Sequence, residues 1–416
     1  MGRGLYTSCP INTTHTKEGG SETGKRELAI VLGIRPDVIR ASIIMKILRS
    51  AEEINVKFIW SGQHYSDNLK DIFFRELEVD TPDIELDVAG VTDAQIMSSV
   101  NDKLFQVLKK LQPSAVVFLG DTNTVMGCLA AVQLNIPIIH IEGCMRSYDW
   151  RMPEEKYRII IDHLSDVIYA YLEEYKRQGV AEGLNADGVV VTGNPIVDVL
   201  DKYYFARKEC YERLSDRKFF RDRELEKSNF YLMTCHRREN VCDLDSLRSI
   251  LDLVEATSKT VYFPASYRIQ KILRTNSLKP PGNVIMVDPI GYQEFLALMS
   301  NSCGVITDSG TVVEEACILQ IPAIQTRRST ERPQVYDVGA CVKFDPTAPE
   351  KYPHKSVFAK LEALRGKSWP NPFGDGRSSE RIAHDILDRL ETGRFDRHYR
   401  TAHWPDISRS FKDDGL

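Results

Sequence analysis

Short hydrophobic runs alternate with amphipathic segments along most of the chain. In the first half, continuous apolar runs lie at 28–33, 56–60, 115–119, 136–142, 167–170 and 188–193. Helical patterns separate these runs, and the longest covers 93–111. Unbroken apolar strands that alternate with helices are typical of a parallel sheet covered on both faces. The pattern therefore predicts one doubly wound α/β domain over residues 27–200.

The same alternation restarts after a segment of a different kind. Residues 201–228 are densely charged and carry no strand pattern, so we expect a helical connector there. Beyond it, the predicted strands lie at 230–235, 260–264, 283–288, 303–308 and 321–325. A second Rossmann-like domain is expected over 229–378, followed by a C-terminal helix and tail at 379–416. Two such domains in tandem face a cleft, which is where we expect the chemistry.

Length and composition fit this two-domain prediction. A chain of 416 residues is too long for one ordinary core. Its 42% hydrophobic and 27% charged content is that of a soluble globular protein. The formal net charge of -5 shows no basic surplus, which argues against a nucleic-acid partner. No apolar run approaches the roughly 18 residues of a membrane span, so no membrane partner is expected.

The first residues and the cysteines bear on cellular location. Residues 1–26 are polar and lack the apolar core of a signal peptide, so we interpret them as a disordered leader. The nine cysteines contain no CxxC pair, and most of them, such as Cys128 and Cys303, lie in apolar runs. Reduced, buried thiols in a cytoplasmic protein show this pattern. Because no pair has the spacing of zinc ligands, no metal site is predicted.

Candidate functional residues follow the predicted strands, because a doubly wound fold binds ligands beyond the carboxyl ends of its strands. After the first strand come Gly33, Arg35 and, about a turn later, Arg40. Arginines near a helix N-terminus suit an anion, although two solvated arginines at a helix start fit the pattern equally well. Asp121 follows the strand at 115–119, and a helix N-cap is the common role of a single aspartate there.

Acidic residues gather around the end of the fourth predicted strand. Glu142 stands at the strand end, whereas the next helix starts only at Pro153, so capping does not easily explain it. A loop salt bridge with Arg146 is the alternative. Glu154 falls in the first turn of that helix, where the macrodipole favours acids. Arg158 comes four residues later, so an ordinary i,i+4 ion pair is its simplest explanation.

The second predicted domain presents groups that suit a diphosphate. His236 and two arginines crowd the turn after the strand at 230–235, and such cations bind phosphates. Ser309 precedes Gly310, which allows close backbone approach where a helix begins, so N–H groups there would hold a phosphate. Glu315 lies one turn into this helix, placed to take two ribose hydroxyls. Neither GxGxxG nor GxxxxGK[ST] occurs, so a dinucleotide fingerprint and a P-loop are both excluded.

Nine motifs occur in order along the chain: "GIRPDVIR", "SGQH", "GDTNT", "HIEGCMRS", "MPEEKYR", "VTGNPIVD", "CHRREN", "TDSGTVVEEA" and "STERP". With this set the chain resembles the non-hydrolysing UDP-N-acetylglucosamine 2-epimerase family, from about residue 28 to about residue 390. The resemblance implies the two-domain glycosyltransferase-B fold. It also implies a homodimer that needs neither a metal nor nicotinamide.

The resemblance further implies a reaction and the residues that perform it. UDP leaves from C1 of the sugar while a carboxylate takes the C2 proton, and UDP re-adds to the glycal after the proton returns on the other face. The catalytic residues would be Asp121, Glu142, Glu154 and His236. The UDP-sugar contacts would be Arg35, Arg40, Arg158, Phe295, Ser309, Gly310, Thr311, Glu315 and Arg332. Such an enzyme interconverts UDP-GlcNAc and UDP-ManNAc for polysaccharide or glycan precursors.

Departures from the family pattern concern the substrate more than the reaction. The stretch "CMRSYDWRMPEE" is short and resembles the branch that acts on 6-deoxy-talose or diacetamido-glucuronate UDP-sugars, so these are the alternatives to UDP-GlcNAc. Ser66 replaces a glutamine that family members use at an allosteric UDP-GlcNAc site. Ile290 replaces a glutamine that usually lies beside the nucleobase. A glycosyltransferase of the same fold, a hydrolysing epimerase and a non-catalytic UDP-sugar sensor are further alternatives. The three matched carboxylates favour the epimerase.

Overall fold

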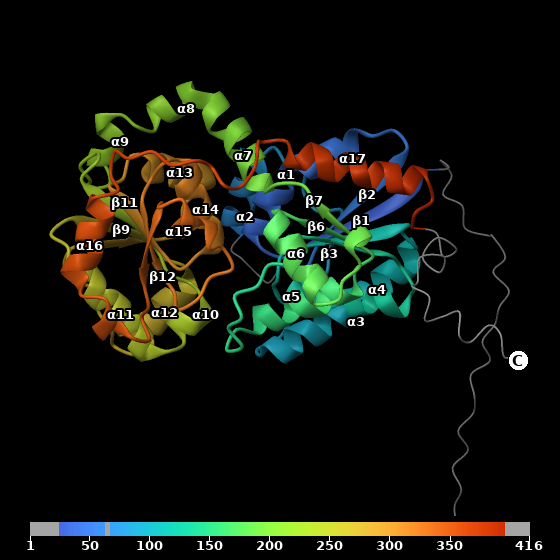
Figure 1. Ribbon diagram of the computed structural model, residues 1–416, viewed down its shortest axis with the longest axis horizontal. Coiled ribbons are helices and arrows are strands. Elements are labelled where there is room, and N and C mark those ends of the chain that lie inside the picture. Colours follow the sequence, from blue (N-terminus) through green and yellow to red (C-terminus); the bar gives the residue numbers. More distant parts are fainter. Residues whose placement is uncertain (1–24, 63–66, 396–416) are drawn as a thin grey trace, which may run out of the picture.

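The computed structural model describes residues 25–62 and 67–395. Most of the expected leader, the position of Ser66 and the chain beyond residue 395 lie outside these ranges. The described chain forms two α/β halves, one with a seven-stranded and one with a six-stranded sheet (Figure 1). Every strand pair in both sheets is parallel. The prediction of two doubly wound domains is therefore confirmed.

The N-terminal sheet has the order β3-β2-β1-β4-β5-β6-β7. Its strands are β1 (Arg26–Leu32), β2 (Ile54–Trp60), β3 (Ile84–Glu85), β4 (Ala115–Leu119), β5 (Ile138–Ile141), β6 (Val167–Ala170) and β7 (Val189–Val191). Every residue of β4, β5 and β6 is buried, because helices cover both faces of the sheet. Burial on both faces explains why these strands are unbroken apolar runs in the sequence.

Helices connect these strands and cover the sheet. They are α1 (Arg35–Ser50), α2 (Asp67–Glu76), α3 (Asp93–Leu111), η1 (Asn123–Gly127), α4 (Cys128–Gln133), α5 (Pro153–Leu164), α6 (Glu173–Ala181) and η2 (Ala186–Gly188). The start of α3 shows why the bounds can be read from sequence. Thr92 Oγ1 accepts the Gln95 N–H at 3.3 Å, and Gln95 Oε1 accepts the Thr92 N–H at 3.1 Å. This capping box satisfies two backbone donors that the helix itself leaves unpaired.

The C-terminal sheet has the order β10-β9-β8-β11-β12-β13. Its strands are β8 (Phe230–Thr234), β9 (Thr260–Pro264), β10 (Val284–Val287), β11 (Gly304–Thr307), β12 (Ala323–Thr326) and β13 (Cys341–Phe344). Its helices are α10 (Arg238–Val241), α11 (Leu244–Glu255), α12 (Tyr267–Thr275), α13 (Tyr292–Ser300), α14 (Gly310–Ile318), α15 (Gln334–Asp337), η4 (Pro349–Lys351) and α16 (His354–Glu362). The sequence pattern missed four short elements. Helices α10 and α15 have four residues each, about one turn, and show no periodicity, β3 has only two residues, and β13 is interrupted by Lys343 and is not a continuous apolar run.

Helical elements link the two halves, as the charge pattern of 201–228 predicts. They are α7 (Pro195–Tyr203), η3 (Phe205–Arg207), α8 (Lys208–Arg213) and α9 (Arg217–Arg221). The sequence pattern did not predict α7, which begins inside the region assigned to the first domain. Asn194 Oδ1 accepts the Ile196 N–H at 3.0 Å, so the helix is capped right after β7.

The last helix, α17 (Ser378–Glu391), returns to the N-terminal half and lies beside α1 and α7 (Figure 1). Asp198 in α7 accepts the backbone N–H groups of Ser378 and Ser379 at 3.2 and 2.7 Å. Tyr169 at the end of β6 donates its hydroxyl hydrogen to Asp385 at 2.8 Å. The chain therefore crosses between the halves twice, and the two crossing segments are bonded to each other through α7 and α17.

Candidate active site

The strand orders fix where a ligand would bind in each half. In the N-terminal sheet the order reverses between β1 and β4, and in the C-terminal sheet it reverses between β8 and β11. Ligands of doubly wound folds bind at the carboxyl ends of strands beside such a reversal. The candidate residues after β1, β4, β8 and β11 stand at these two points. Beside these points, Glu142 after β5 and Arg158 of α5 contact Arg332 and Glu331, which follow β12, so the candidate site lies where the halves meet.

Glu142, which follows β5, joins two guanidinium groups from different halves of the molecule. Its Oε1 accepts a hydrogen bond from Arg332 Nη2 at 2.6 Å. Its Oε2 pairs with Arg40 Nη1. All three side chains are buried. The alternative pairing with Arg146 does not occur, because that guanidinium binds Asp162 and Glu182, each at 2.7 Å.

The backbone of Glu142 has φ of 76°, a value that non-glycine residues seldom adopt. Its N–H bonds the carbonyl of Tyr169 in β6 at 3.1 Å. The left-handed conformation turns the chain at the strand end and points the carboxylate toward Arg40. Gly120, at the neighbouring end of β4, has φ of 83°, and a Cβ there would lie 3.8 Å from Glu142 Oε2. Strain of this kind clusters at functional sites because the surrounding structure must hold it.

Asp37 supports the Arg40 side chain from the first turn of α1. Its Oδ1 accepts a hydrogen bond from Arg40 Nη2 at 3.2 Å. Its Oδ2 accepts the Ile34 N–H at 3.2 Å, and the aspartate is completely buried. Burial raises the pKa of Asp37 to about 7, although Arg40 acts in the opposite direction. A group poised in this way can hold the arginine and exchange a proton near neutral pH.

Asp121, which follows β4, pairs with Arg158 Nη2 from α5. Burial alone would raise the pKa of Asp121, but the guanidinium groups of Arg158 and Arg237 outweigh it and lower the pKa below its usual value. Arg158 also donates to Glu155 at 3.0 Å and lies 3.6 Å from Glu331. Within the described chain, the ion pairs of Arg158 are with Asp121, Glu155 and Glu331, so the expected i,i+4 pair with Glu154 is not formed.

Glu331 is a central buried carboxylate that sequence reasoning missed. It is fully buried and lies within 2.8 to 3.6 Å of four guanidinium groups, those of Arg327, Arg332, Arg237 and Arg158. Burial disfavours its charged form, but these four cations hold its pKa well below the usual range. The motif "STERP" contains the signal, since it places a carboxylate beside an arginine in a loop after β12. Nothing local in the sequence shows that four arginines converge on it.

Glu154 differs from the other carboxylates of this region. It is half-buried, and its Oε2 is buried without a hydrogen-bond partner in the described structure. Burial raises its pKa, Arg237 works against that shift and Asp121 adds to it. Glu155, one residue on, instead accepts the backbone N–H groups of Ser147 and Tyr148 at 3.0 and 2.8 Å. The structure thus separates a carboxylate with spare bonding capacity from one that fixes a loop.

His236, after β8, is held through its backbone. Its N–H donates to Asp308 at 3.0 Å, and the Arg237 N–H donates to the same carboxylate at 2.9 Å. Asn240 adds a third bond to Asp308 at 3.2 Å. The imidazole Nδ1 lies 3.5 Å from Asp308 Oδ1, and the His236 side chain is 48% exposed. The buried aspartate therefore fixes the turn while the imidazole keeps an accessible face.

The N-terminus of α14 is covered by the Arg332 side chain. Ser309 caps the helix, with Oγ accepting the Val312 N–H at 3.4 Å. A Cβ at Gly310 would lie 2.4 Å from Arg332 Nη1, so only glycine allows this close approach. Thr311 is buried in the first turn. A guanidinium beside the N–H groups of a helix start makes a site for an anion.

A second set of predicted contacts lies around α13. Glu315, in α14, is buried and accepts the Tyr292 hydroxyl hydrogen at 2.7 Å. Burial raises the pKa of Glu315 to about 8, against the effect of this hydrogen bond. Phe295 is half-buried one turn further along α13. Arg35 lies over the ring of Phe73, with its Cζ 5.1 Å from the centroid.

These observations sort the predicted residues into two groups. One network of contacts and electrostatic couplings joins the first group, made of Arg40, Asp121, Glu142, Glu154, Arg158, Gly310 and Arg332. Ser309 and Thr311 flank Gly310, and His236 adjoins Arg237 of the same network. Arg35, Phe295 and Glu315 form the second group, around Phe73 and Tyr292.

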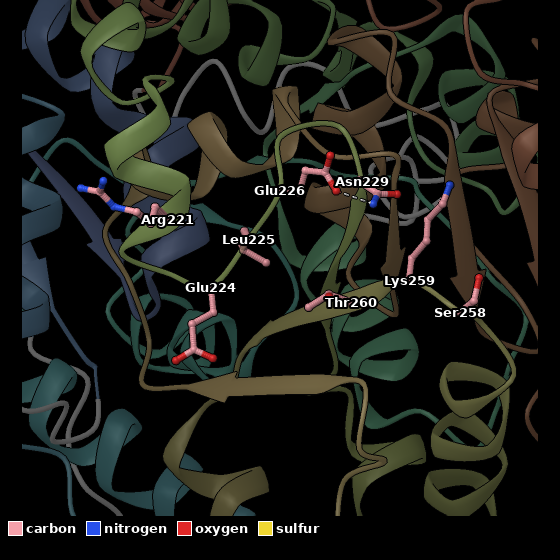
Figure 2. A pocket seen from close by; sticks show the side chains of 8 residues that line it. All are labelled: Arg221, Glu224, Leu225, Glu226, Asn229, Ser258, Lys259 and Thr260. Atoms are coloured by element: carbon pink, nitrogen blue, oxygen red, sulfur yellow. Dashed lines mark hydrogen bonds between the residues drawn. The ribbon is translucent and has the colours of Figure 1, made fainter.

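A surface pocket of about 540 Å³ lies elsewhere (Figure 2). It is lined by Arg221, Glu224, Leu225, Glu226, Asn229, Ser258, Lys259 and Thr260. Asn229 precedes β8 and Thr260 begins β9, so the pocket is at the amino ends of the strands, the edge opposite His236. Among residues 25–62 and 67–395, no group of three or more His, Cys, Asp or Glu side chains is arranged to hold a metal ion. In that same part of the chain, no helix is long and apolar enough to cross a membrane.

Comparison with known proteins gives consistent matches. The family model described as UDP-N-acetylglucosamine 2-epimerase matches residues 46–387. A UDP-N-acetylglucosamine 2-epimerase from Methanocaldococcus jannaschii is 36% identical, over 86% of this chain and 97% of the relative. A crystal structure from the same organism, in complex with UDP-GlcNAc and UDP, aligns with a TM-score of 0.79 and 34% identity over 87% of this chain and 99% of that one. The UDP-2,3-diacetamido-2,3-dideoxy-D-glucuronate 2-epimerase of Pseudomonas aeruginosa is 31% identical, over 86% of this chain and 98% of the relative.

Proposed function

The chain belongs to the UDP-N-acetylglucosamine 2-epimerase family and has its glycosyltransferase-B-like fold, and from this membership we propose that it interconverts UDP-GlcNAc and UDP-ManNAc. The observation that carries the proposal is the Arg332–Glu142 contact of 2.6 Å. It brings a cation at the helix N-terminus of one half onto a buried carboxylate of the other. A reaction that expels a diphosphate and moves a proton needs both groups at one place.

The proposed reaction is an elimination followed by a re-addition. The C2–H and C1–O bonds of the sugar break, a C1–C2 double bond forms, and UDP leaves with the electron pair of the C1–O bond. A carboxylate takes the C2 proton, and a proton is then delivered to the opposite face of C2 as UDP re-adds to C1. Because the C2 proton is weakly acidic, cations on the leaving diphosphate must lower the barrier. Arg332 and Arg40 are assigned to that task, together with the N–H groups at Gly310. Desolvation lowers the pKa of His236, so its assigned role is to donate a hydrogen bond to the diphosphate.

The carboxylates differ in a way that suggests separate roles. Glu154 has a raised pKa and an oxygen without a partner, which suits a group that gains and loses a proton. Asp121 has a lowered pKa and pairs with Arg158, which suits a group that stays charged and holds a cation. Glu142 bridges Arg40 and Arg332, so it orients both guanidinium groups. When substrate binds, its diphosphate takes the place of the Glu142 carboxylate on these two groups. These assignments are part of the proposal.

A 2-epimerase of a modified UDP-sugar is the second candidate. The similarity to the diacetamido-glucuronate epimerase favours it, as does the loop between β5 and α5. In that loop Tyr148 and Trp150 are 65% and 64% exposed, and Asp149 reaches across to Ser329 at 3.1 Å. The loop is therefore anchored to the C-terminal half while its aromatic side chains stay available. Such side chains can contact additional groups on a sugar ring.

The decisive experiment is incubation with UDP-GlcNAc in D₂O without an acceptor, followed by proton NMR. Epimerisation predicts deuterium at C2 and a mixture of UDP-GlcNAc and UDP-ManNAc, with UDP remaining in the nucleotide sugar. Free ManNAc and UDP would instead identify a hydrolysing epimerase. The same assay with the 6-deoxy and diacetamido-uronate sugars ranks the substrates by exchange rate. Absence of exchange with all of them would refute an epimerase function and leave transfer or binding.

We also propose that the protein is a cytoplasmic homodimer. Two apolar side chains of α4, Leu129 and Val132, are 40% and 42% exposed, and Ile160 of the adjoining α5 is 37% exposed. A two-fold symmetric dimer buries the same patch on both subunits, so this face is suited to self-association. The eight cysteines of the described chain are free thiols, which supports a reducing compartment. Sedimentation velocity of the wild type and of Val132→Glu tests the dimer.

A further inference from the structure

Helix α13 of the C-terminal half has an N-terminus without a cap of its own. Its N-cap position is Gly291, which has no side chain to accept the first N–H groups of the helix. Those donors face a carboxylate from the other half. Glu76, the last residue of α2, accepts the Gln293 N–H at 3.0 Å. A side chain of the N-terminal domain thus performs the capping role for a helix of the C-terminal domain.

The glycine at position 291 fits this contact. Its φ of -68° and ψ of 164° are open to any residue, so backbone conformation does not require glycine there. The limited space requires glycine instead, because a Cβ at this position would lie 2.6 Å from Glu76 Oε1 and 3.0 Å from Ile72 Cγ2. Ile72 also belongs to α2. Close approach of α2 to the start of α13 is therefore what glycine permits.

The capped helix carries or contacts two residues that the family resemblance assigns to the UDP-sugar, Phe295 and Glu315. Tyr292 donates its hydroxyl hydrogen to Glu315 at 2.7 Å, and Phe295 lies one turn further along. The Tyr292 ring also lies against Phe73 of α2, with centroids 6.4 Å apart. The same α2 therefore contacts α13 through a charged cap and through an aromatic ring. Both contacts exist only when the two halves are together.

We propose that Glu76 is a positioning residue that fastens α13 when the two domains are closed and so holds Tyr292 and Phe295 in place for the nucleotide. The proposal rests on the proposed function for the identity of the ligand, whereas the fastening itself does not. Separation of the domains breaks the hydrogen bond and leaves the first turn of α13 uncapped. Binding of a nucleotide against α13 and closure of the domains are then coupled, because each is favoured by the same ordered helix start.

Three variants and a control isolate this contact. Glu76→Ala removes the acceptor, and Gly291→Ala displaces the carboxylate while leaving its charge in the molecule. Glu76→Gln keeps a carbonyl oxygen that can accept the Gln293 N–H, so it should restore most of the effect. Glu78→Ala is the matched control, because this glutamate is exposed two residues away and pairs with Lys46 and Arg207, not with α13.

The first measurement is hydrogen exchange at the Gln293 amide without nucleotide. We expect exchange about fivefold faster in Glu76→Ala and Gly291→Ala, the size of a lost helix cap, and no change in Glu78→Ala. The second is UDP titration by calorimetry, where the two disrupting variants should bind about fivefold more weakly and Glu76→Gln within about twofold of wild type.

The outcomes separate the two proposals. Unchanged amide exchange in both disrupting variants would overturn the fastening of α13. Faster exchange with unchanged UDP affinity would overturn the positioning role and leave a purely structural contact. A wild type that binds no UDP would count against the proposed function, while the exchange measurement would still decide the fastening.

Discussion

Replacement of Glu331 by glutamine tests the charge arrangement most directly. The carboxylate is fully buried, with guanidinium nitrogens at 2.8, 3.0, 3.4 and 3.6 Å. Glutamine keeps the shape but removes the charge, so four buried cations lose a shared counter-ion. Breaking a buried ion pair by removing one partner costs about 3–5 kcal/mol. Because the amide oxygen still accepts hydrogen bonds, we expect a loss near the lower end, about 3 kcal/mol.

Urea unfolding at pH 7 measures this loss. With a slope of about 2 kcal/mol per M for a domain of this size, the midpoint of the C-terminal transition should fall by about 1.5 M. Glu380→Gln is the control, because this glutamate makes an exposed pair with Arg377 at 3.1 Å and should shift the midpoint by less than about 0.5 M. A midpoint of Glu331→Gln within about 0.3 M of wild type would refute the reasoning, since it would mean that the cations do not depend on this carboxylate.

The pH dependence of the stability loss in Glu331→Gln provides a second check. The pKa of Glu331 is well below its usual value in the folded protein, because four guanidinium groups outweigh the effect of burial. The carboxylate therefore stabilises the fold at pH values above the unfolded pKa of about 4.3. That stabilisation is lost as the pH falls below about 4.3 toward the folded pKa. The difference in the free energy of unfolding between wild type and Glu331→Gln should therefore be largest near pH 7 and should shrink only in acid.

Three further substitutions probe the site. Gly310→Ala places a Cβ 2.4 Å from Arg332 Nη1 and must displace that guanidinium, so UDP affinity in calorimetry should fall about tenfold, and an unchanged affinity would contradict the anion site. Glu142→Gln should reduce epimerase turnover at least about a hundredfold in the NMR assay, because Arg40 and Arg332 lose the carboxylate that orients them; near-normal turnover would remove this residue from the site. Tyr171→Phe removes a buried hydroxyl that has no partner in the described structure, so thermal unfolding should show equal or slightly greater stability, by up to about 1 kcal/mol, and a clear loss would show that the hydroxyl is bonded.

The fold could be predicted from the sequence because its signals are local. Burial on both faces produces the apolar runs of β1, β4 and β6, and burial of one side produces the helical pattern of α3. Each of these patterns is visible within one short window of sequence. The alternation of such runs with helices then fixes parallel sheets. Strand β3 was missed because it has only two residues, and β13 because a lysine interrupts its apolar run.

Strand-end positions also drew attention to Asp121, Glu142 and His236 without any coordinates, because parallel strands all end at the same edge of a sheet. The sequence could not say which charges meet. By spacing, Arg158 belongs with Glu154, yet it pairs with Asp121 and Glu155. Ion pairs are chosen by distance in three dimensions, and spacing along a helix is only one contribution to that distance.

The sequence by itself therefore determined two doubly wound domains, their family and the residues at the strand ends. The tertiary structure alone decided how the buried charges are neutralised, with Glu331 shared among arginines and Glu142 bridging the two halves. Only it showed that Glu76 caps a helix of the other domain. The physical reason is common to all three. A charge or helix end removed from water must be satisfied by whatever group the fold brings near, and that group is often far away in the chain.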